Sequence, residues 1–130
     1  MGYLNIVFLG TGTSQGVPVI GCDCEVCLSN EEKDKRLRSS ILITSDKGTQ
    51  ITIDAGPDFR TQMLNANVKY LDAILVTHAH RDHVSGLDDV RSYNYLQQSP
   101  MPIFANKYAI ESIKNEFSYA FSNVKYPGLP

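Results

Sequence analysis

Three histidines and one aspartate lie close together in this 130-residue chain. Residues 77–83 read Thr-His-Ala-His-Arg-Asp-His and hold all three histidines of the protein. His78 and His80 are two residues apart, so in extended backbone they project to the same side. Two imidazoles on one side can bind a single ion of zinc, manganese or iron. The spacing therefore predicts that His78 and His80 bind one metal ion.

Asp82 and His83 follow this pair directly, at a point where the backbone can turn. They can face a second metal position beside the first. Two close metal ions can polarise a phosphoryl or carbonyl oxygen and supply a hydroxide near neutral pH. The motif therefore predicts a dinuclear hydrolytic site. The alternative is a solvated loop that is rich in histidine and binds no metal.

A strand is expected to position these side chains. Residues 71–76 are an apolar run rich in β-formers, which predicts a buried strand that ends at the motif. Ligand sites collect where the strands of open sheets end. Further strands are predicted at residues 4–9, 40–45, 50–54 and 102–105, and the second and third of these form a hairpin. Helices are predicted at residues 57–66, 84–96 and 107–117.

A second group of possible ligands is Cys22, Cys24 and Cys27, spaced as C-x-C-x-x-C. Clustered thiolates in a reducing compartment suggest a structural zinc site. A tetrahedral site needs a fourth ligand, and the chain has no other cysteine and no histidine outside the first motif. The alternatives are three thiols without metal, or a redox role for Cys24 and Cys27. Whether or not zinc is bound, we expect the three cysteines to form a cluster without a disulfide.

Composition excludes several classes of function. The net charge of −2 and the absence of a basic run make a nucleic-acid partner improbable. No apolar run could span a membrane, the start of the chain does not look like a signal peptide, and the cysteines suit a cytoplasmic location. We expect residues 1–130 to form a single unit. In the charged segment 29–38, Arg36 or Arg38 could bind a substrate phosphate, but mixed charges favour simple solvation.

The histidine motif resembles the metal-binding motif of the metallo-β-lactamase superfamily. Together with the glycine-rich residues 9–18 and the cysteine motif, it resembles the cyclic phosphodiesterase branch of that superfamily, the phosphoribosyl cyclic phosphate phosphodiesterase-like proteins. The resemblance covers residues 4 to about 95. It implies an α/β (α+β) fold, a mixed sheet with flanking helices, that forms the N-terminal half of an αββα sandwich.

The resemblance also implies roles for individual residues. His78 and His80 would bind the first metal, and Asp82 and His83 the second, with Asp82 as a catalytic residue that orients the hydroxide. The family's cysteines hold a structural zinc together with a late histidine. Asp54, in Asp-Ala-Gly-Pro, matches the family's D-x-G element, whose carboxylate can accept an imidazole N–H and fix which nitrogen faces the metal. Asp54 could also serve simply as a turn or helix-entry residue.

The chain departs from the family pattern after His83, because no later histidine exists to supply the ligands of the second half. We therefore expect an N-terminal part, either a fragment or a natural short protein, that is inactive alone. The full form would be a zinc-dependent hydrolase, with manganese or iron as alternatives, acting on small phosphodiesters or cyclic phosphates with two catalytic ions and one structural zinc. Alternatives are an RNA-processing nuclease of the same superfamily and a metal-binding module without turnover.

Half a sandwich leaves one face of the sheet uncovered. We expect this apolar face to drive association with a second copy of the chain or with the missing half. The candidate positions on this face are Ile6, Phe8, Ile41, Ile43, Ile51, Ile53, Ile74 and Val76.

Overall fold

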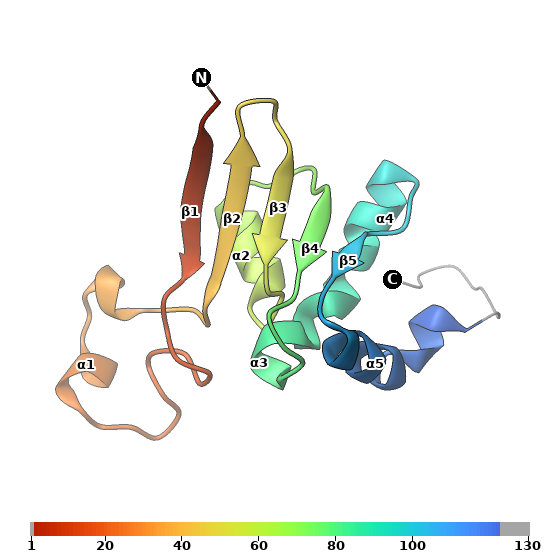
Figure 1. Ribbon diagram of the computed structural model, residues 1–130. Helices are drawn as coiled ribbons and strands as arrows, with labels where there is room; N and C mark the ends of the chain where they lie inside the picture. Colours follow the sequence, from red (N-terminus) through yellow and green to blue (C-terminus); the bar gives the residue numbers. More distant parts are fainter. Residues whose placement is uncertain (1, 123–130) are drawn as a thin grey trace.

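One mixed sheet of five strands organises the computed structural model, which describes residues 2–122 (Figure 1). The strands lie in the order β1-β2-β3-β4-β5; β1 to β3 pair antiparallel, and β3 to β5 pair parallel. Their bounds are Leu4–Gly10, Ser40–Ser45, Gln50–Ile53, Ala73–Leu75 and Ile103–Phe104. The predicted mixed sheet and the hairpin are confirmed. The predicted irregular tail at residues 124–130 lies outside the described residues.

The helices differ from the sequence prediction mainly after the histidine motif. The predicted continuous helix at 84–96 is wrong: the chain forms three short helical segments, the last ending at Gln97. The break follows from Gly86, whose amide donates to the Ala55 carbonyl at 2.9 Å and whose Cα has no room for a Cβ beside the Gly56 carbonyl. The helices are α1 (Glu25–Leu28), η1 (Glu32–Asp34), α2 (Phe59–Asn65), α3 (Arg81–Val84), η2 (Ser85–Val90), α4 (Arg91–Gln97), α5 (Lys107–Glu116) and η3 (Ser118–Phe121).

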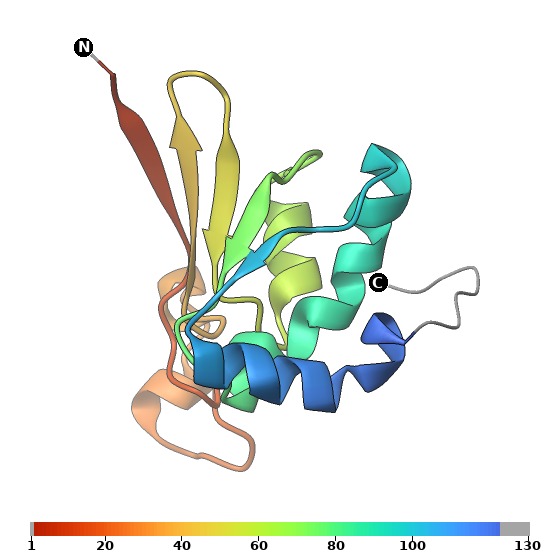
Figure 2. The ribbon, with the colours of Figure 1, turned by 45° about the vertical axis from the view of Figure 1, so that its right-hand side comes forward.

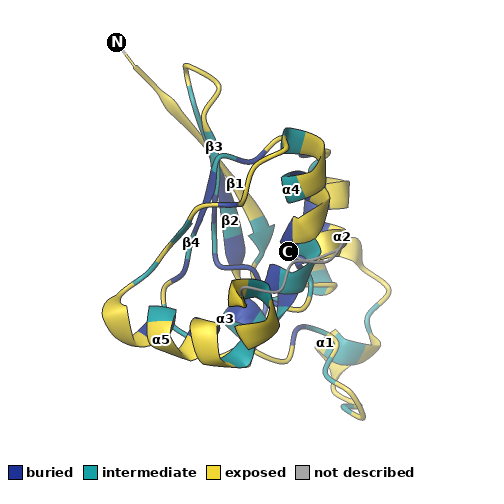
Figure 3. Ribbon diagram, turned by 90° about the vertical axis from the view of Figure 1, so that its right-hand side faces the viewer, coloured by how far each residue is buried: buried dark blue, intermediate teal, exposed yellow. Residues whose placement is uncertain are grey.

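The core lies between the sheet and the helices α2, α4 and α5, which lie on the same side of the sheet (Figure 2). Strand residues alternate between faces, and the register aligns Leu42, Thr52 and Ile74 on the helix side. Buried residues concentrate in this layer (Figure 3). On α4, Tyr93 is buried in this layer, whereas Leu96 is 68% exposed.

The opposite face of the sheet carries large apolar side chains with no second layer among the described residues. The register aligns Phe8, Ile41, Ile53, Leu75 and Phe104 across all five strands. Phe8 is 72% exposed and Phe104 is 60% exposed. We call this the open face.

Two predicted members of the open face are misplaced. Ile74 and Val76 lie in the core instead, and both are buried. The cause is the register of β4, which pairs Ile74 with Thr52 and so assigns it to the helix side. Within the described part of the chain, no helix is long and apolar enough to cross a membrane.

Strand direction determines where the chemistry gathers. Two successive antiparallel pairings make β1 run in the same direction as β3, and β4 and β5 run parallel to β3. The segments that follow β1, β3 and β4 therefore all leave the sheet at one edge. These segments contain the glycine-rich loop, Asp54 and the histidine motif.

Candidate metal centre

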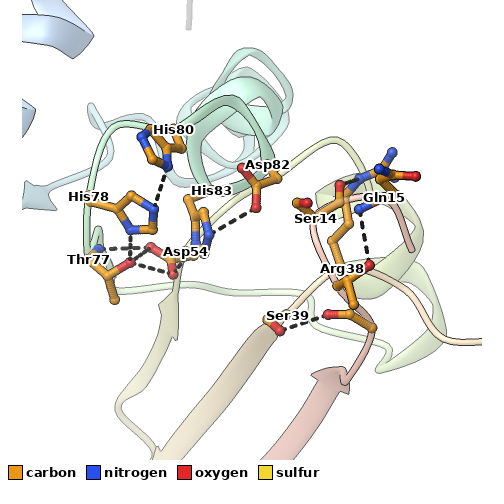
Figure 4. Close-up of polar contacts among 12 residues, drawn as sticks. Ser14, Gln15, Arg38, Ser39, Asp54, Thr77, His78, His80, Asp82 and His83 are labelled. Atoms are coloured by element: carbon orange, nitrogen blue, oxygen red, sulfur yellow. Dashed lines mark hydrogen bonds and ion pairs between the residues drawn. The ribbon is translucent and has the colours of Figure 1, made fainter. Parts of the chain in front are cut away.

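His78 and His80 converge at this edge, in the connection between β4 and α3 (Figure 4). Nε2 of His78 lies 3.1 Å from Nδ1 of His80. Two nitrogens bound to one tetrahedral zinc, with bonds of about 2.0–2.1 Å, are roughly 3.3 Å apart. The two side chains thus point to the same side, as their spacing predicted, and their facing nitrogens are at hydrogen-bonding distance, close to the separation that one shared ion would give. Metal binding by this pair stays a prediction.

Asp82 and His83 form a second pair beside the first. Oδ2 of Asp82 lies 3.0 Å from Nε2 of His83, and the rings of His78 and His83 have centroids 4.0 Å apart. Both residues belong to the short helix α3, not to an extended loop. Adjacent residues on this single turn can therefore present a carboxylate and an imidazole to one point.

Asp54 connects the His78–His80 pair to the Asp82–His83 pair. This carboxylate is buried, and its Oδ2 lies 2.7 Å from Nδ1 of His83. It also accepts from Thr77, at 2.8 Å from both the backbone N–H and the hydroxyl. The Thr77 hydroxyl lies 3.0 Å from Nδ1 of His78. The position predicted for Asp54 next to the motif is therefore confirmed.

These contacts assign the protons on two of the imidazoles. The Thr77 hydroxyl donates to Asp54, so Nδ1–H of His78 donates to the Thr77 oxygen. Nδ1–H of His83 donates to Asp54 directly. In a neutral ring the remaining lone pair is then on Nε2, which in His83 lies 3.0 Å from Oδ2 of Asp82, so that a proton or a metal ion must lie between those two atoms. Sequence reasoning missed Thr77, although a hydroxyl residue immediately before the first histidine was a usable signal.

Tight backbone packing holds Asp54 under α3. The Ala55 amide donates to the His83 carbonyl at 2.8 Å. A Cβ atom at Gly56 would overlap the carbonyl oxygen of Asp82, so only glycine fits there. Asp54 itself has a φ of +65°, a left-handed conformation that aspartate tolerates better than most residues. The glycine of the Asp-Ala-Gly sequence is thus required by the close approach of two backbones.

The three thiols gather in the loop before and within α1. Cys22, Cys24 and Cys27 have Sγ atoms within 4.8 Å of one another, and all three are free. The Cys27 backbone N–H and the Cys22 thiol lower the pKa of Cys24. The Val19 amide acts to lower the pKa of Cys27. The Cys22 thiol, burial and Cys24 act in the opposite direction, and together they leave the pKa of Cys27 raised. The predicted convergence of the three thiols is confirmed, and the structural zinc stays a prediction.

Two charged residues, Asp88 and Arg38, form ion pairs with other side chains. Oδ2 of Asp88 lies 3.9 Å from Nη1 of Arg91, an ion pair between two exposed side chains. Arg38 is not merely solvated: its guanidinium lies 3.0 Å from Oδ1 of Asp58, and its Nε donates to the Ser14 carbonyl at 2.8 Å. Arg38 therefore connects two segments at the edge of the sheet that carries the site.

Comparison with known proteins gives several matches. A family model described as "Beta-lactamase superfamily domain" matches residues 49–130. The octanoyltransferase of Porphyromonas gingivalis is 45% identical over 98% of this chain, which covers 25% of that protein. Coenzyme PQQ synthesis protein B of Methylobacterium radiotolerans is 27% identical over 85% of this chain and 40% of its own length.

Solved structures agree with these matches. The crystal structure of "a New Diphosphatase from the PhnP Family" superposes with a TM-score of 0.88 at 43% identity, over 93% of this chain and 49% of that one. Zn(2+)-bound PqqB from Methylobacterium extorquens gives a TM-score of 0.71 at 26% identity, over 88% of this chain and 40% of that one. The chain thus spans about a quarter to a half of the length of these relatives.

Proposed function

Because this chain belongs to the metallo-β-lactamase superfamily, we propose that it carries the metal-binding part of a hydrolase for phosphodiester or cyclic phosphate bonds. The observation that carries this proposal is the arrangement of two paired ligand sets above one buried carboxylate. The 43% identity to a diphosphatase supports a phosphorus-centred reaction.

The donor set fits two ions of zinc, or of manganese or iron. His78 and His80 would hold the first ion, and Asp82 and His83 the second. When bound, such ions polarise a phosphoryl oxygen and supply a hydroxide nucleophile near neutral pH. Asp54 keeps the Nδ1 proton on His83, so that Nε2 retains its lone pair. The carboxylate of Asp82 can also accept a hydrogen bond from the attacking oxygen and orient it.

The thiol cluster fits a structural zinc. Cys22, Cys24 and Cys27 supply three soft ligands, and zinc prefers four. We propose that the fourth ligand comes from polypeptide outside residues 1–130. A zinc ion here would stabilise the long connection between β1 and β2 without taking part in the reaction.

The catalytic ligand set is also short in this chain. A catalytic zinc normally has three protein ligands, and the first ion would have only His78 and His80. We propose that further ligands, together with a second sheet over the open face, come from additional polypeptide, as the greater length of the relatives suggests. The shortage also supports the alternative that residues 1–130 alone act as a metal-binding module without turnover.

A chimera tests the proposed function. Residues 1–130 would be joined to the unmatched remainder of the 43% identical diphosphatase and assayed on bis-para-nitrophenyl phosphate with zinc or manganese. We expect metal-dependent hydrolysis that His80→Ala abolishes and Arg60→Ala, a control on an exposed side chain of α2, preserves. The 130-residue chain alone should be at least about a hundredfold slower, because displaced reacting groups cost rate steeply. A folded, metal-loaded chimera without turnover would refute the proposal.

A further inference from the structure

We propose that Arg38 is a positioning residue that holds residues 11–15 as a phosphate-binding loop beside the metal centre. The inference rests on the proposed function, because it assigns the substrate's phosphate to a second group of contacts at the same edge of the sheet. We call residues 11–15, which follow β1 directly, the phosphate loop.

Three consecutive residues at the start of β2 join three different segments. The Arg38 side chain donates to the Ser14 carbonyl and, at 3.0 Å, to Asp58, next to the start of α2. The Ser39 hydroxyl donates to the Gly12 carbonyl at 3.0 Å. The Ser40 hydroxyl lies 3.1 Å from the Asp54 carbonyl. This run of residues therefore connects the phosphate loop to the turn that carries Asp54.

The backbone approaches so closely here that side chains would not fit. A Cβ atom at Gly10 would overlap the Arg38 carbonyl oxygen, and one at Gly12 would crowd the Arg36 carbonyl oxygen. The Gly12 amide donates to the Leu37 carbonyl at 2.8 Å, and the Val17 amide donates to the Arg36 carbonyl at 2.8 Å. Gly10 and Gly12 are thus explained by their packing against residues 36–38.

Arg38 itself is poorly suited to bind the phosphate. Its guanidinium is neutralised by Asp58, which contacts it with both carboxylate oxygens, and Asp58 also accepts the Arg38 backbone N–H at 2.8 Å. Gln62 donates to the Arg38 carbonyl at 2.8 Å. A guanidinium paired with Asp58 and donating to Ser14 acts through the segments that it holds.

What Arg38 holds is rich in hydrogen-bonding groups. Thr11, Thr13, Ser14 and Gln15 are all exposed. Hydroxyl, amide and backbone N–H groups of such a loop can donate to phosphate oxygens. The loop leaves β1 two strands from β3, a separation of roughly 10 Å from the Asp54 segment. Figure 4 shows Ser14 and Gln15 at the same end of the sheet as Asp82 and His83.

The test separates phosphate binding from metal binding. The chain would be loaded with cobalt(II), and inorganic phosphate would be titrated by calorimetry and by the cobalt absorption spectrum. Arg38→Ala should weaken phosphate binding about tenfold, the effect of losing roughly 1.4 kcal/mol of loop contacts, while cobalt affinity stays unchanged. Arg38→Lys keeps the ion pair with Asp58 but lacks the Nε donor to Ser14. Its phosphate affinity should lie between those of wild type and Arg38→Ala. Arg60→Ala removes the same charge as a control.

Two further readouts keep the proposal decidable if Arg38→Ala is unstable. Ser14→Ala, which leaves the Arg38 contacts intact, should also weaken phosphate binding. Hydrogen exchange at the Gly12 and Val17 amides should accelerate in Arg38→Lys, while exchange in β3 stays the same. Unchanged phosphate affinity in the Arg38 variants, or a parallel loss of cobalt affinity, would overturn the proposal. If wild-type chain binds no cobalt at the histidines, the proposed function fails, and the same titration on metal-free protein still tests Arg38.

Discussion

Nδ1 of His83 lies 2.7 Å from Oδ2 of Asp54, a residue 29 positions earlier in the chain. This contact ties the turn after β3 to helix α3, and Thr77 extends it to His78. A buried carboxylate is costly unless it is hydrogen-bonded, and Asp54 accepts from three donor groups. One side chain therefore orients two of the three imidazoles.

Replacing Asp54 by Asn should weaken metal binding at the histidines. The amide presents only one acceptor oxygen, so it cannot hold both His83 and Thr77 as the carboxylate does. Loss of such supporting contacts typically costs about 10–100-fold in metal affinity. The measurement is a cobalt(II) competition titration in a background where the three cysteines are serine. Asp46→Asn, on an exposed side chain, is the matched control, and equal affinity in Asp54→Asn and wild type would contradict the assignment.

The thiols should differ in their reactivity toward alkylation. The thiolate is the reactive form, and the pKa of Cys24 is lowered while that of Cys27 is raised. As the pH rises, Cys24 should therefore ionise and react first, and Cys27 later. Limiting iodoacetamide on metal-stripped, unreduced protein, read by mass spectrometry across a pH series, measures the order. A total of fewer than three free thiols, or Cys27 reacting at lower pH than Cys24, would count against the cluster as described.

Tyr93 offers a test of the helix layer. Its hydroxyl donates to the Val68 carbonyl at 2.9 Å, and burial raises its pKa to about 12. Below an unfolded-state pKa of about 10 the protonated phenol contributes its full stability, which is then lost as the pH rises through 12. Tyr93→Phe should cost about 1 kcal/mol of unfolding free energy at pH 8. Urea titrations should show this difference shrinking above roughly pH 10, whereas exposed Tyr95→Phe should show no difference at either pH.

The open face should make the isolated chain associate. Large apolar patches without a covering layer favour contact with other protein surfaces. Light scattering should find species larger than a monomer at micromolar concentration, and Phe8→Lys should shift them toward the monomer. Tyr95→Lys is the control, because Tyr95 is equally exposed but lies on α4. A monodisperse wild-type monomer would show that the open face does not act in this way.

The sequence predicted the local geometry of the histidine motif. The motif from His78 to His83 is only six residues long, so its geometry follows from strand and helix periodicity. The face of Ile74 was predicted wrongly for a physical reason. β4 carries apolar residues on both faces, so its pattern does not reveal which side the helices cover. Only the pairing of Ile74 with Thr52 decides it.

The contacts that support the site were harder to foresee. Arg38 meets Asp58 and Ser14 across 20 and 24 residues, and no spacing rule relates such partners. The mixed charges around Arg38 favoured solvation, because a charged segment is usually exposed. The interruption at Gly86 was missed likewise, since the need for glycine arises from the Gly56 backbone 30 residues away.

The central claim is that His78, His80, Asp82 and His83 bind metal ions. The most direct measurement is an anomalous difference map at the zinc absorption edge, from crystals of the chain grown with zinc. We predict a peak about 2.0–2.1 Å from both Nε2 of His78 and Nδ1 of His80, with a second peak at Asp82 and His83 that His83→Ala removes. A map with no peak at these four residues, or with peaks only at the thiols, would contradict the account.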